Sequence, residues 1–169
     1  MEFRFKAGRL PMLVSMPHAG TDIPDEVAHT LAPCAAARAD TDWHLPELYG
    51  FLEEMGISNI SARWSRYLSD LNRPPEDTNL YPGLDTTGLC PLDTFGRERL
   101  YRDGMEPDGA EVQQRLARYR QPYHAQLREQ VAPYDADRFV APDIEAARTM
   151  VGQGAVSASC KTLFTALHP

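Results

Sequence analysis

Two short apolar runs separated by helical periodicity constrain the fold of this chain more than any other feature. Residues 12–16 (MLVSM) end at Pro17, and residues 57–64 follow Gly56, so each run has the length of a buried strand. Between the two runs, apolar residues recur at helical spacing. A strand–helix–strand order places strands beside each other with helices packed over them. The sequence therefore predicts a layered α/β domain.

Two helices are predicted between the runs. The first opens at Pro24, because proline and the two acids that follow it suit the first turn of a helix, and it stops near Pro33. The second begins around residues 40–42 and stops at Gly56, a residue type that commonly ends helices. Its predicted apolar face carries Leu45, Leu48, Leu52 and Met55.

A long irregular segment and a third helix follow the second run. Residues 65–107 are rich in Pro, Gly, Asp and Thr and show little periodicity, which is typical of an active-site loop or a disordered insert. From Val112 to Val131 the apolar residues return at helical spacing and predict an amphipathic helix. Pro122 should strain that helix, because proline has no backbone N–H to donate.

Charge and composition exclude several classes of partner. The formal net charge is −7 and no stripe of basic residues is present, which argues against nucleic acid. No apolar run approaches the ~18 residues of a membrane span, and the first twenty residues carry no signal-peptide pattern. We therefore expect a cytoplasmic protein with no membrane partner. The three cysteines are scattered and odd in number, so reduced thiols are expected.

Candidate metal ligands lie at the end of the first run and at the start of the second predicted helix. His18 follows the strand, where open α/β sheets bind ligands, although a lone histidine can equally be structural. Asp40, Asp42 and His44 place two carboxylates and an imidazole within five positions, which suits zinc. The alternative is that Asp40 or Asp42 caps the helix that follows.

A cationic cluster follows the second run and comprises Arg66, Asn72 and Arg73. A guanidinium holds a carboxylate through two parallel hydrogen bonds, which lysine does not reproduce, and an arginine can also stabilise an oxyanion. An acidic protein needs such a local cationic pocket to bind an acidic substrate. The alternative is a solvated network of salt bridges with Asp70 and Glu76.

Seven segments in sequence order resemble successive blocks of the N-formylglutamate amidohydrolase family, over about residues 10 to 132. They are PHAGTDIP (17–24), ADTDWH (39–44), SRYLSDLNRPP (65–75), LYPG (80–83), TTGLCP (86–91), LYR (100–102) and RYRQPYH (118–124). The DLNR segment is also similar to the substrate-binding segment of aspartoacylases and zinc carboxypeptidases. By this resemblance, the fold should be a three-layer α/β/α sandwich with a mixed sheet, of the phosphorylase/hydrolase-like kind.

The resemblance implies hydrolysis of N-formyl-L-glutamate to formate and L-glutamate, a reaction of histidine degradation, with zinc or another divalent transition metal as cofactor. Asn72 and Arg73 would grip a carboxylate of this small dicarboxylate, and Arg66 would polarise the scissile carbonyl. The substrate is a dianion, so a second cationic anchor is expected from Arg63 or Arg102.

The resemblance also implies a set of metal ligands. His18 would be the first zinc ligand. Relatives place a glutamate three residues later, where this chain has Thr21. Asp42 or Asp40 is the substitute we expect, with His44 in the same cluster and Asp22 as a further option.

The end of the chain departs from the family pattern. Residues 1–134 match the N-terminal part of an amidohydrolase domain, whereas residues 135–169 carry no Asp-x-His-Ser block, which holds the third metal ligand in relatives. We expect a truncated or frameshifted chain with an incomplete sheet, possible inactivity, and oligomerisation through an unpaired sheet edge. A genuine replacement of the missing half is the alternative. The competing functions are hydrolysis of another N-acyl amino acid and non-catalytic binding of a dicarboxylate or a protein.

Overall fold

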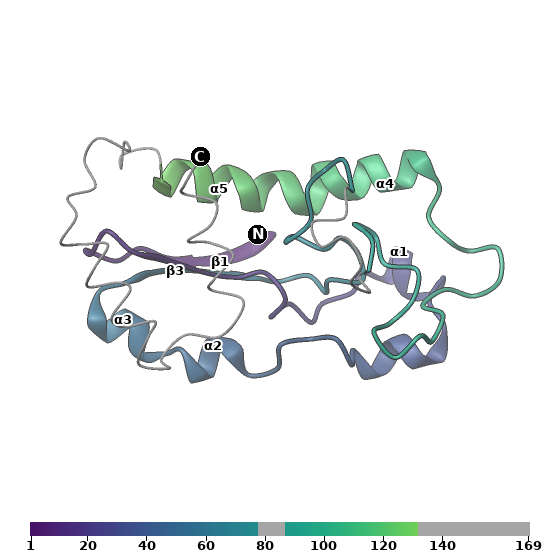
Figure 1. The fold of residues 1–169 in the computed structure, drawn as a ribbon, viewed down its shortest axis with the longest axis horizontal. Coiled ribbons are helices and arrows are strands. Elements are labelled where there is room, and N and C mark those ends of the chain that lie inside the picture. The colour runs from purple at the N-terminus through teal and green to yellow at the C-terminus, as the bar shows by residue number, and fades with distance from the viewer. Residues whose placement is uncertain (78–86, 132–169) are drawn as a thin grey trace, which may run out of the picture.

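Three strands form one mixed sheet at the centre of the computed structural model, which describes residues 1–77 and 87–131 (Figure 1). The strands are β1 (Phe3–Lys6), β2 (Leu13–Met16) and β3 (Ser58–Ala62), in the order β1–β3–β2. The central strand, β3, runs antiparallel to β1 and parallel to β2. A mixed α/β fold is thereby confirmed.

The two strands predicted from apolar runs are confirmed, and a third was missed. β2 and β3 fall within the predicted runs at residues 12–16 and 57–64. β1 has the sequence Phe-Arg-Phe-Lys, an alternation of apolar and basic residues that is typical of a strand with one face buried. Among the described residues β1 and β2 are the edges of the sheet, because each pairs with β3 only.

The helices between β2 and β3 are shorter than predicted. They are α1 (Asp25–Ala28), the 3₁₀ helix η1 (Pro33–Ala37), α2 (Leu45–Leu48) and α3 (Phe51–Met55). The predicted start at residues 40–42 is wrong, because His44, with φ 60°, turns the chain left-handed just before α2. The predicted apolar face is also wrong at Leu48, which is largely exposed. The stop at Gly56 is confirmed, since this glycine has φ 75°.

The third predicted helix is confirmed as a continuous run composed of α4 (Gly109–Arg115), the π-helical segment η2 (Leu116–Arg120) and α5 (Gln121–Val131). Asp108 caps α4 by accepting a hydrogen bond from the Glu111 N–H at 2.8 Å. Pro122 accounts for the π segment, because its ring conflicts with the carbonyl four residues earlier. The Gln121 N–H accordingly donates to the Leu116 carbonyl, five residues back.

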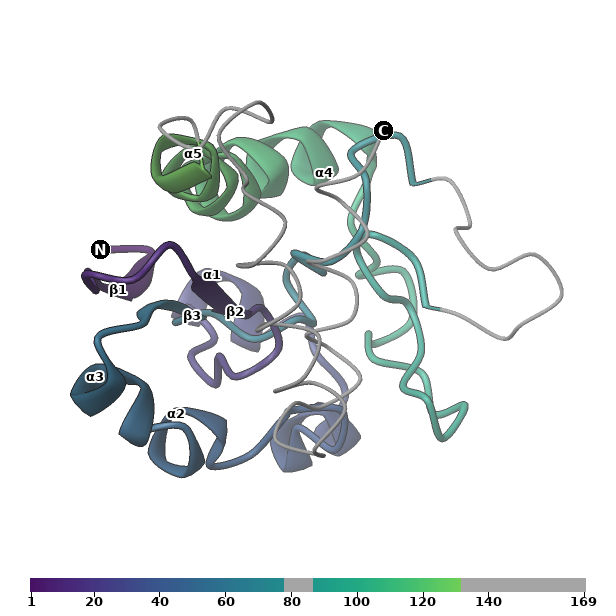
Figure 2. The ribbon, with the colours of Figure 1, turned by 60° about the vertical axis from the view of Figure 1, so that its left-hand side comes forward.

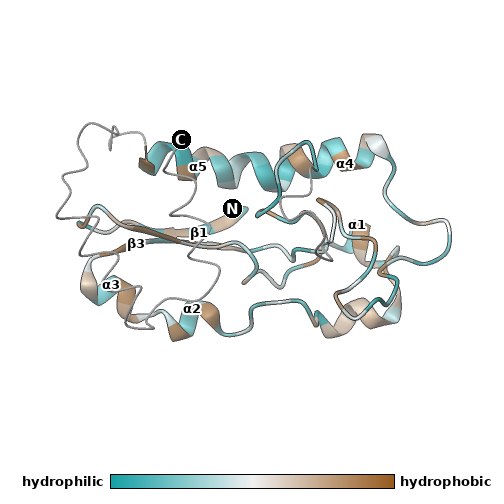
Figure 3. Cartoon of the chain, viewed as in Figure 1, coloured by the Kyte–Doolittle hydropathy of each residue, from teal (hydrophilic) through white to brown (hydrophobic). Residues whose placement is uncertain are grey.

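The helices of the described residues lie on both sides of the sheet. Figures 1 and 2 show the α4–α5 run along one side and the pair α2–α3 along the other. Ile60 and Ala62 of β3 pack against Tyr123 of α5, and this cluster also contains Leu71. Figure 3 shows hydrophobic residues along the strands, whereas much of α5 is hydrophilic, as expected for a helix with one face toward solvent.

The described parts of the long irregular segment contribute to the core. Residues 65–77 and 87–107 contain no helix or strand, as predicted. Yet Tyr67, Leu68 and Leu100 are buried together in one apolar cluster, so these residues are a packed loop rather than a solvated insert. None of the helices in the described ranges is long and apolar enough to cross a bilayer.

Candidate active site

The ends of β2 and β3 bring two distant loops together. The N–H groups of Thr21 and Asp22, which follow β2, both donate to the Arg63 carbonyl, which follows β3, at 3.1 Å. Gly20 makes this approach possible, because a Cβ atom there would lie 2.1 Å from the Trp64 carbonyl oxygen. The residues that follow β2 and those that follow β3 therefore meet at the end of the sheet where these two strands finish.

A buried ion-paired group lies at these strand ends and consists of His18, Asp70 and Arg66. The Nε2 atom of His18 lies 2.8 Å from Oδ1 of Asp70, and Nη2 of Arg66 donates to Oδ2 of Asp70 at 2.5 Å. The exposed fractions are 8% for His18, 2% for Asp70 and 7% for Arg66. The backbone N–H of Asn72 donates to the same carboxylate at 2.9 Å, so Asp70 accepts bonds from three directions.

The Asp70 carboxyl is held in its ionised form despite its burial. Burial alone would raise its pKa, but the hydrogen bond from His18 and the positive charge of Arg66 outweigh this effect and lower the pKa to about 2. An ionised carboxylate can only accept hydrogen bonds, so His18 donates through Nε2–H. In the neutral imidazole, the other ring nitrogen, Nδ1, would then carry the lone pair that can bind a ligand.

Asp42 is the predicted metal ligand that the structure brings to His18. Its Oδ2 atom lies 3.8 Å from Nδ1 of His18, and its backbone N–H donates to the His18 carbonyl at 3.0 Å. Two ligand atoms of one tetrahedral zinc ion, each ~2 Å from the metal, lie about 3.3 Å apart. The two atoms are therefore near each other but further apart than two ligands of one tetrahedral zinc ion.

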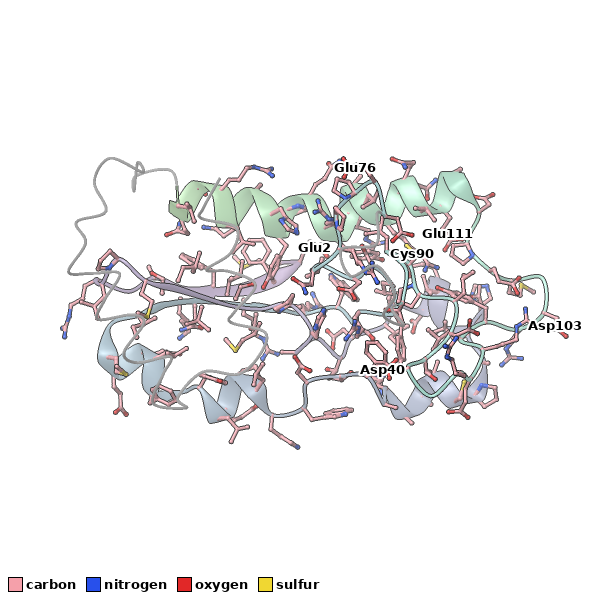
Figure 4. All side chains as sticks on the ribbon, in the orientation of Figure 1. Glu2, Asp40, Glu76, Cys90, Asp103 and Glu111 are labelled. Atoms are coloured by element: carbon pink, nitrogen blue, oxygen red, sulfur yellow. The ribbon has the colours of Figure 1, made fainter. Side chains whose placement is uncertain are left out.

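The structure does not bring Asp40 or His44 to this pair. The carboxylate of Asp40 accepts a hydrogen bond from the Phe95 N–H at 3.1 Å, and Figure 4 shows it on the opposite side of the sheet from α4 and α5. His44 is exposed. Neither Asp40 nor Asp42 caps α2, because its N-terminal cap is His44, with no side-chain hydrogen bond. The helix-cap alternative is therefore wrong.

The residues present fit two positions of a metal site. Zinc in a catalytic site takes three protein ligands and keeps one position open. No group of three or more His, Cys, Asp or Glu side chains arranged to hold a metal occurs in residues 1–77 and 87–131. Within these residues, His18 and Asp42 are thus a candidate pair for which no third ligand is found.

The predicted substrate-binding residues differ in their surroundings. Arg73 is 9% exposed, and no hydrogen bond or ion pair of its guanidinium is found within the described part of the chain. Asn72 beside it is exposed. Arg102 is exposed and its Nε donates to the Leu31 carbonyl at 3.1 Å, which ties it to the loop after α1.

The predicted salt-bridge alternative holds for Arg66, although the pair is buried rather than solvated. Its guanidinium binds Asp70, and it also stacks over the Phe95 ring at 4.8 Å. Asp70 itself was considered only as a partner of this network, and its contact with His18 was missed. The signal in the sequence was the spacing of four residues between Arg66 and Asp70, with the Asn72–Arg73 pair beginning two residues after Asp70.

An open pocket with a volume of about 560 Å³ lies beside the strand ends. Arg63 is on its wall, half-exposed, and its Nε donates to Asp22 at 2.7 Å. The remaining lining residues are Thr21, Ile23, Pro24, Asp25, Arg38, Trp43 and Trp64. Of the two candidates for a second cationic anchor, Arg63 therefore faces a pocket and Arg102 contacts a backbone carbonyl.

Known proteins with similar sequences share one description. The sequence profile of the family described as N-formylglutamate amidohydrolase matches residues 10–151. An N-formylglutamate deformylase of Pseudomonas aeruginosa is 47% identical over 133 residues, which are 79% of this chain and 50% of that protein. One from Pseudomonas putida is 45% identical over 127 residues, 75% of this chain and 47% of its own length. The chain thus spans about half the length of these relatives.

Solved structures agree with this similarity. The crystal structure of an N-formylglutamate amidohydrolase from Ralstonia eutropha superposes with a TM-score of 0.66 and 27% identity, covering 82% of this chain and 53% of that one. A gene product of Agrobacterium tumefaciens gives a TM-score of 0.61 at 22% identity, covering 78% and 50%. The second likeness concerns the fold alone.

Proposed function

We propose that this chain, which belongs to the N-formylglutamate amidohydrolase family, contributes the carboxylate-binding and first metal-binding residues for hydrolysis of N-formyl-L-glutamate to formate and L-glutamate. The observation that carries this proposal is the buried contact of His18 with Asp70, which directs Nδ1 of the imidazole toward Asp42. Histidines that ligate metals usually donate their other N–H to a carboxylate in this way.

His18 and Asp42 would hold a divalent metal, with zinc as the first choice for an imidazole and a carboxylate. A metal bound there would polarise the formyl carbonyl and lower the pKa of the attacking water. Asp70 fixes the ring orientation and the tautomer of His18, and Arg66 keeps Asp70 ionised. In this arrangement Arg66 acts on the site through Asp70, in addition to the carbonyl-polarising role that the family resemblance suggests.

Arg73 would bind one carboxylate of the substrate. Within residues 1–77 and 87–131 no anionic partner of the buried Arg73 guanidinium is found, and a bound carboxylate would pair with it through two parallel hydrogen bonds. Asn72, which precedes Arg73 and is exposed, would donate its side-chain amide N–H to the same substrate carboxylate. The candidates for the second carboxylate are Arg63, which lines the 560 Å³ pocket and is paired with Asp22, and Arg102, whose Nε donates to the Leu31 carbonyl.

We further propose that the mixed sheet and its two helical sides form part of a complete three-layer α/β/α sandwich. The support is the likeness to the solved amidohydrolase, of which this chain covers 53%. In that arrangement additional strands would extend the sheet beyond the edge strand β2. If the edge stays open, pairing with a second chain at β2 is the expected consequence.

Two measurements test the proposal. Purified protein should hold close to one zinc ion per chain by elemental analysis, and His18→Ala and Asp42→Ala should each remove it. Asp103→Asn is the matched control, because Asp103 is an exposed carboxylate far along the chain from the strand ends. Zinc retained equally in all variants would contradict the ligand assignment.

Turnover separates the competing activities. N-formyl-L-glutamate should be hydrolysed in preference to N-acetyl-L-aspartate and N-succinyl-L-glutamate, with formate as product. Preference for another N-acyl amino acid would favour the related-amidohydrolase alternative. If the protein contains no zinc and turns over no substrate but still binds L-glutamate, a non-catalytic dicarboxylate-binding chain would be favoured.

A further inference from the structure

The segment that carries Asn72 and Arg73 is held on one side by a single turn of the long helix. Nε of Arg120 donates to the Arg73 carbonyl at 2.9 Å. Four residues later, Nε2 of His124 lies 2.8 Å from the Leu71 carbonyl oxygen, which can only accept. Residues four apart lie on the same helix face, so Arg120 and His124 both donate to backbone carbonyls of the short segment 71–73.

The other side of the same segment is held by Asp70. The Asn72 N–H donates to the Asp70 side chain at 2.9 Å, and the Arg73 N–H donates to the Asp70 carbonyl at 3.1 Å. Two backbone donors of the segment therefore face Asp70, and two of its backbone acceptors face the helix. Its backbone is fixed from both sides by bonds that do not use the side chains of Asn72 and Arg73.

The same helix turn is tied to the strand that delivers His18. Tyr123 lies between the two donors in sequence, and its hydroxyl lies 2.7 Å from Oγ of Ser15 in β2, three residues before His18. The Tyr123 hydroxyl also lies within 3.4 Å of the Ile60 carbonyl in β3, and its side chain is fully buried. One turn thus contacts both strands and the segment of residues 71–73.

The π-helical segment sets the direction of this turn. It ends at Arg120, two residues before Pro122, and a π segment rotates the residues that follow relative to those before it. Arg115, ahead of the π segment, donates to the Tyr101 hydroxyl at 2.6 Å. The helix therefore faces residue 101 on one side of the π segment and residues 71–73 on the other. Figure 4 shows Glu76, three residues beyond Arg73, next to the helix.

We propose that Arg120 and His124 are positioning residues that set the place of the Asn72–Arg73 carboxylate clamp relative to His18. This inference rests on the proposed function, because it assumes that the clamp binds a substrate carboxylate. A role limited to stabilising the core predicts that their loss lowers the stability of the whole fold. A positioning role predicts a local effect on residues 71–73 and on ligand affinity.

Hydrogen exchange of the full chain gives the first readout. In Arg120→Met and His124→Leu, the amides of Asn72 and Arg73 should exchange roughly tenfold faster, while the amides of β2 and β3 keep their protection. Arg118→Met is the matched control, because Arg118 lies on the same helix but pairs with Glu26 at 2.6 Å. Unchanged exchange at residues 72 and 73, or equal acceleration in the strands, would overturn the proposal.

Binding of L-glutamate by calorimetry gives the second readout. Its dissociation constant should rise roughly tenfold in Arg120→Met and His124→Leu, and stay near the starting value in His124→Gln, which retains a donor for the Leu71 carbonyl. If His124→Leu fails to fold, His124→Gln remains decisive, since a tenfold loss there with normal exchange contradicts the positioning role.

The outcomes separate this inference from the proposed function. An unaltered chain that binds no L-glutamate would refute the carboxylate clamp itself. An unaltered chain that binds L-glutamate, with variants that bind it equally well, would refute only the positioning role of the helix turn. For turnover, KM for N-formyl-L-glutamate should rise more than kcat falls, because the clamp holds a part of the substrate that does not react.

Discussion

Residues 65–70 and residues 71–73 are consecutive parts of one loop, yet their charged side chains are held in different ways. In the first part, Arg66 is neutralised inside the protein by Asp70 at 2.5 Å. In the second part, Arg73 is similarly buried, but its hydrogen bonds within the described residues are made by its backbone. The same residue type, seven positions apart, thus has two different surroundings.

The difference concerns which bonds order the two parts of the loop. Side chains of residues 65–70 bond to one another and to His18, so they define the shape of the strand-end site. Residues 71–73 obtain their order from backbone bonds to Asp70 and to the helix, and within the described residues no bond of the Arg73 guanidinium is found. Four predictions test this contrast, from the largest expected effect to the smallest.

Replacing Asp70 should have the largest effect on stability. Asp70→Asn keeps the shape but leaves Arg66 buried without its anion, which should lower the free energy of unfolding by about 3–5 kcal/mol. The matched control is Asp103→Asn, since Asp103 forms an exposed pair with Arg99 at the same four-residue spacing, and its loss should cost about 0–1 kcal/mol. Urea denaturation measures both. Equal losses would mean that burial of the first pair has no energetic consequence.

Arg66→Lys should also destabilise the fold, by a smaller amount. Lysine keeps the charge but cannot reproduce the planar guanidinium that bonds Asp70 and stacks on Phe95, so a loss of about 1–3 kcal/mol in unfolding free energy is expected. Thermal and urea denaturation give the value. A variant as stable as the parent would show that the charge alone holds Asp70.

Arg73→Lys should affect binding rather than stability. The unfolding free energy should change by no more than about 0.5 kcal/mol, because no side-chain bond of Arg73 within the described residues is lost. L-glutamate should bind roughly tenfold more weakly in calorimetry, since the two parallel hydrogen bonds to a carboxylate are lost. Unchanged affinity would remove the carboxylate-clamp role and with it the contrast between the two arginines.

The smallest effect should be a pH dependence of stability at His124, because the buried imidazole is costly to protonate. Burial lowers the pKa of His124 below 6.5, the hydrogen bond to the Leu71 carbonyl opposes this, and the charges of Arg120 and Arg128 lower it further. Below pH 6.5 the unfolded chain therefore binds more protons at this residue than the folded chain. The stability contributed by His124 is present above that pH and is lost as the pH falls through the folded pKa.

His124→Gln should remove this component. Between pH 7.5 and 5.5 the parent protein should lose more thermal stability than the variant, as measured by its unfolding midpoint at each pH. A variant whose midpoint falls as steeply as that of the parent would assign the acid sensitivity to other groups. The exchange of the Asn72 amide over the same range shows whether the loss is local.

Much of the fold follows from local patterns, whereas the helix lengths do not. The runs at residues 12–16 and 57–64 and the helical spacing from Val112 to Val131 each report burial on one side of a single element. The helix predicted from residues 40–42 failed because His44 takes a left-handed conformation, which no spacing rule anticipates for a residue with a side chain.

The sequence by itself determined which residue types gather at the strand ends and the α/β class of the fold, because periodicity and composition act over a few neighbouring residues. Only the tertiary structure decided which atoms meet: Asp42 rather than Asp40 beside His18, and Asp70 as the buried link between His18 and Arg66. His18 and Asp70 are 52 positions apart. Contacts over such separations depend on how the strands pair and which side chains become buried, and no short window of sequence contains that information.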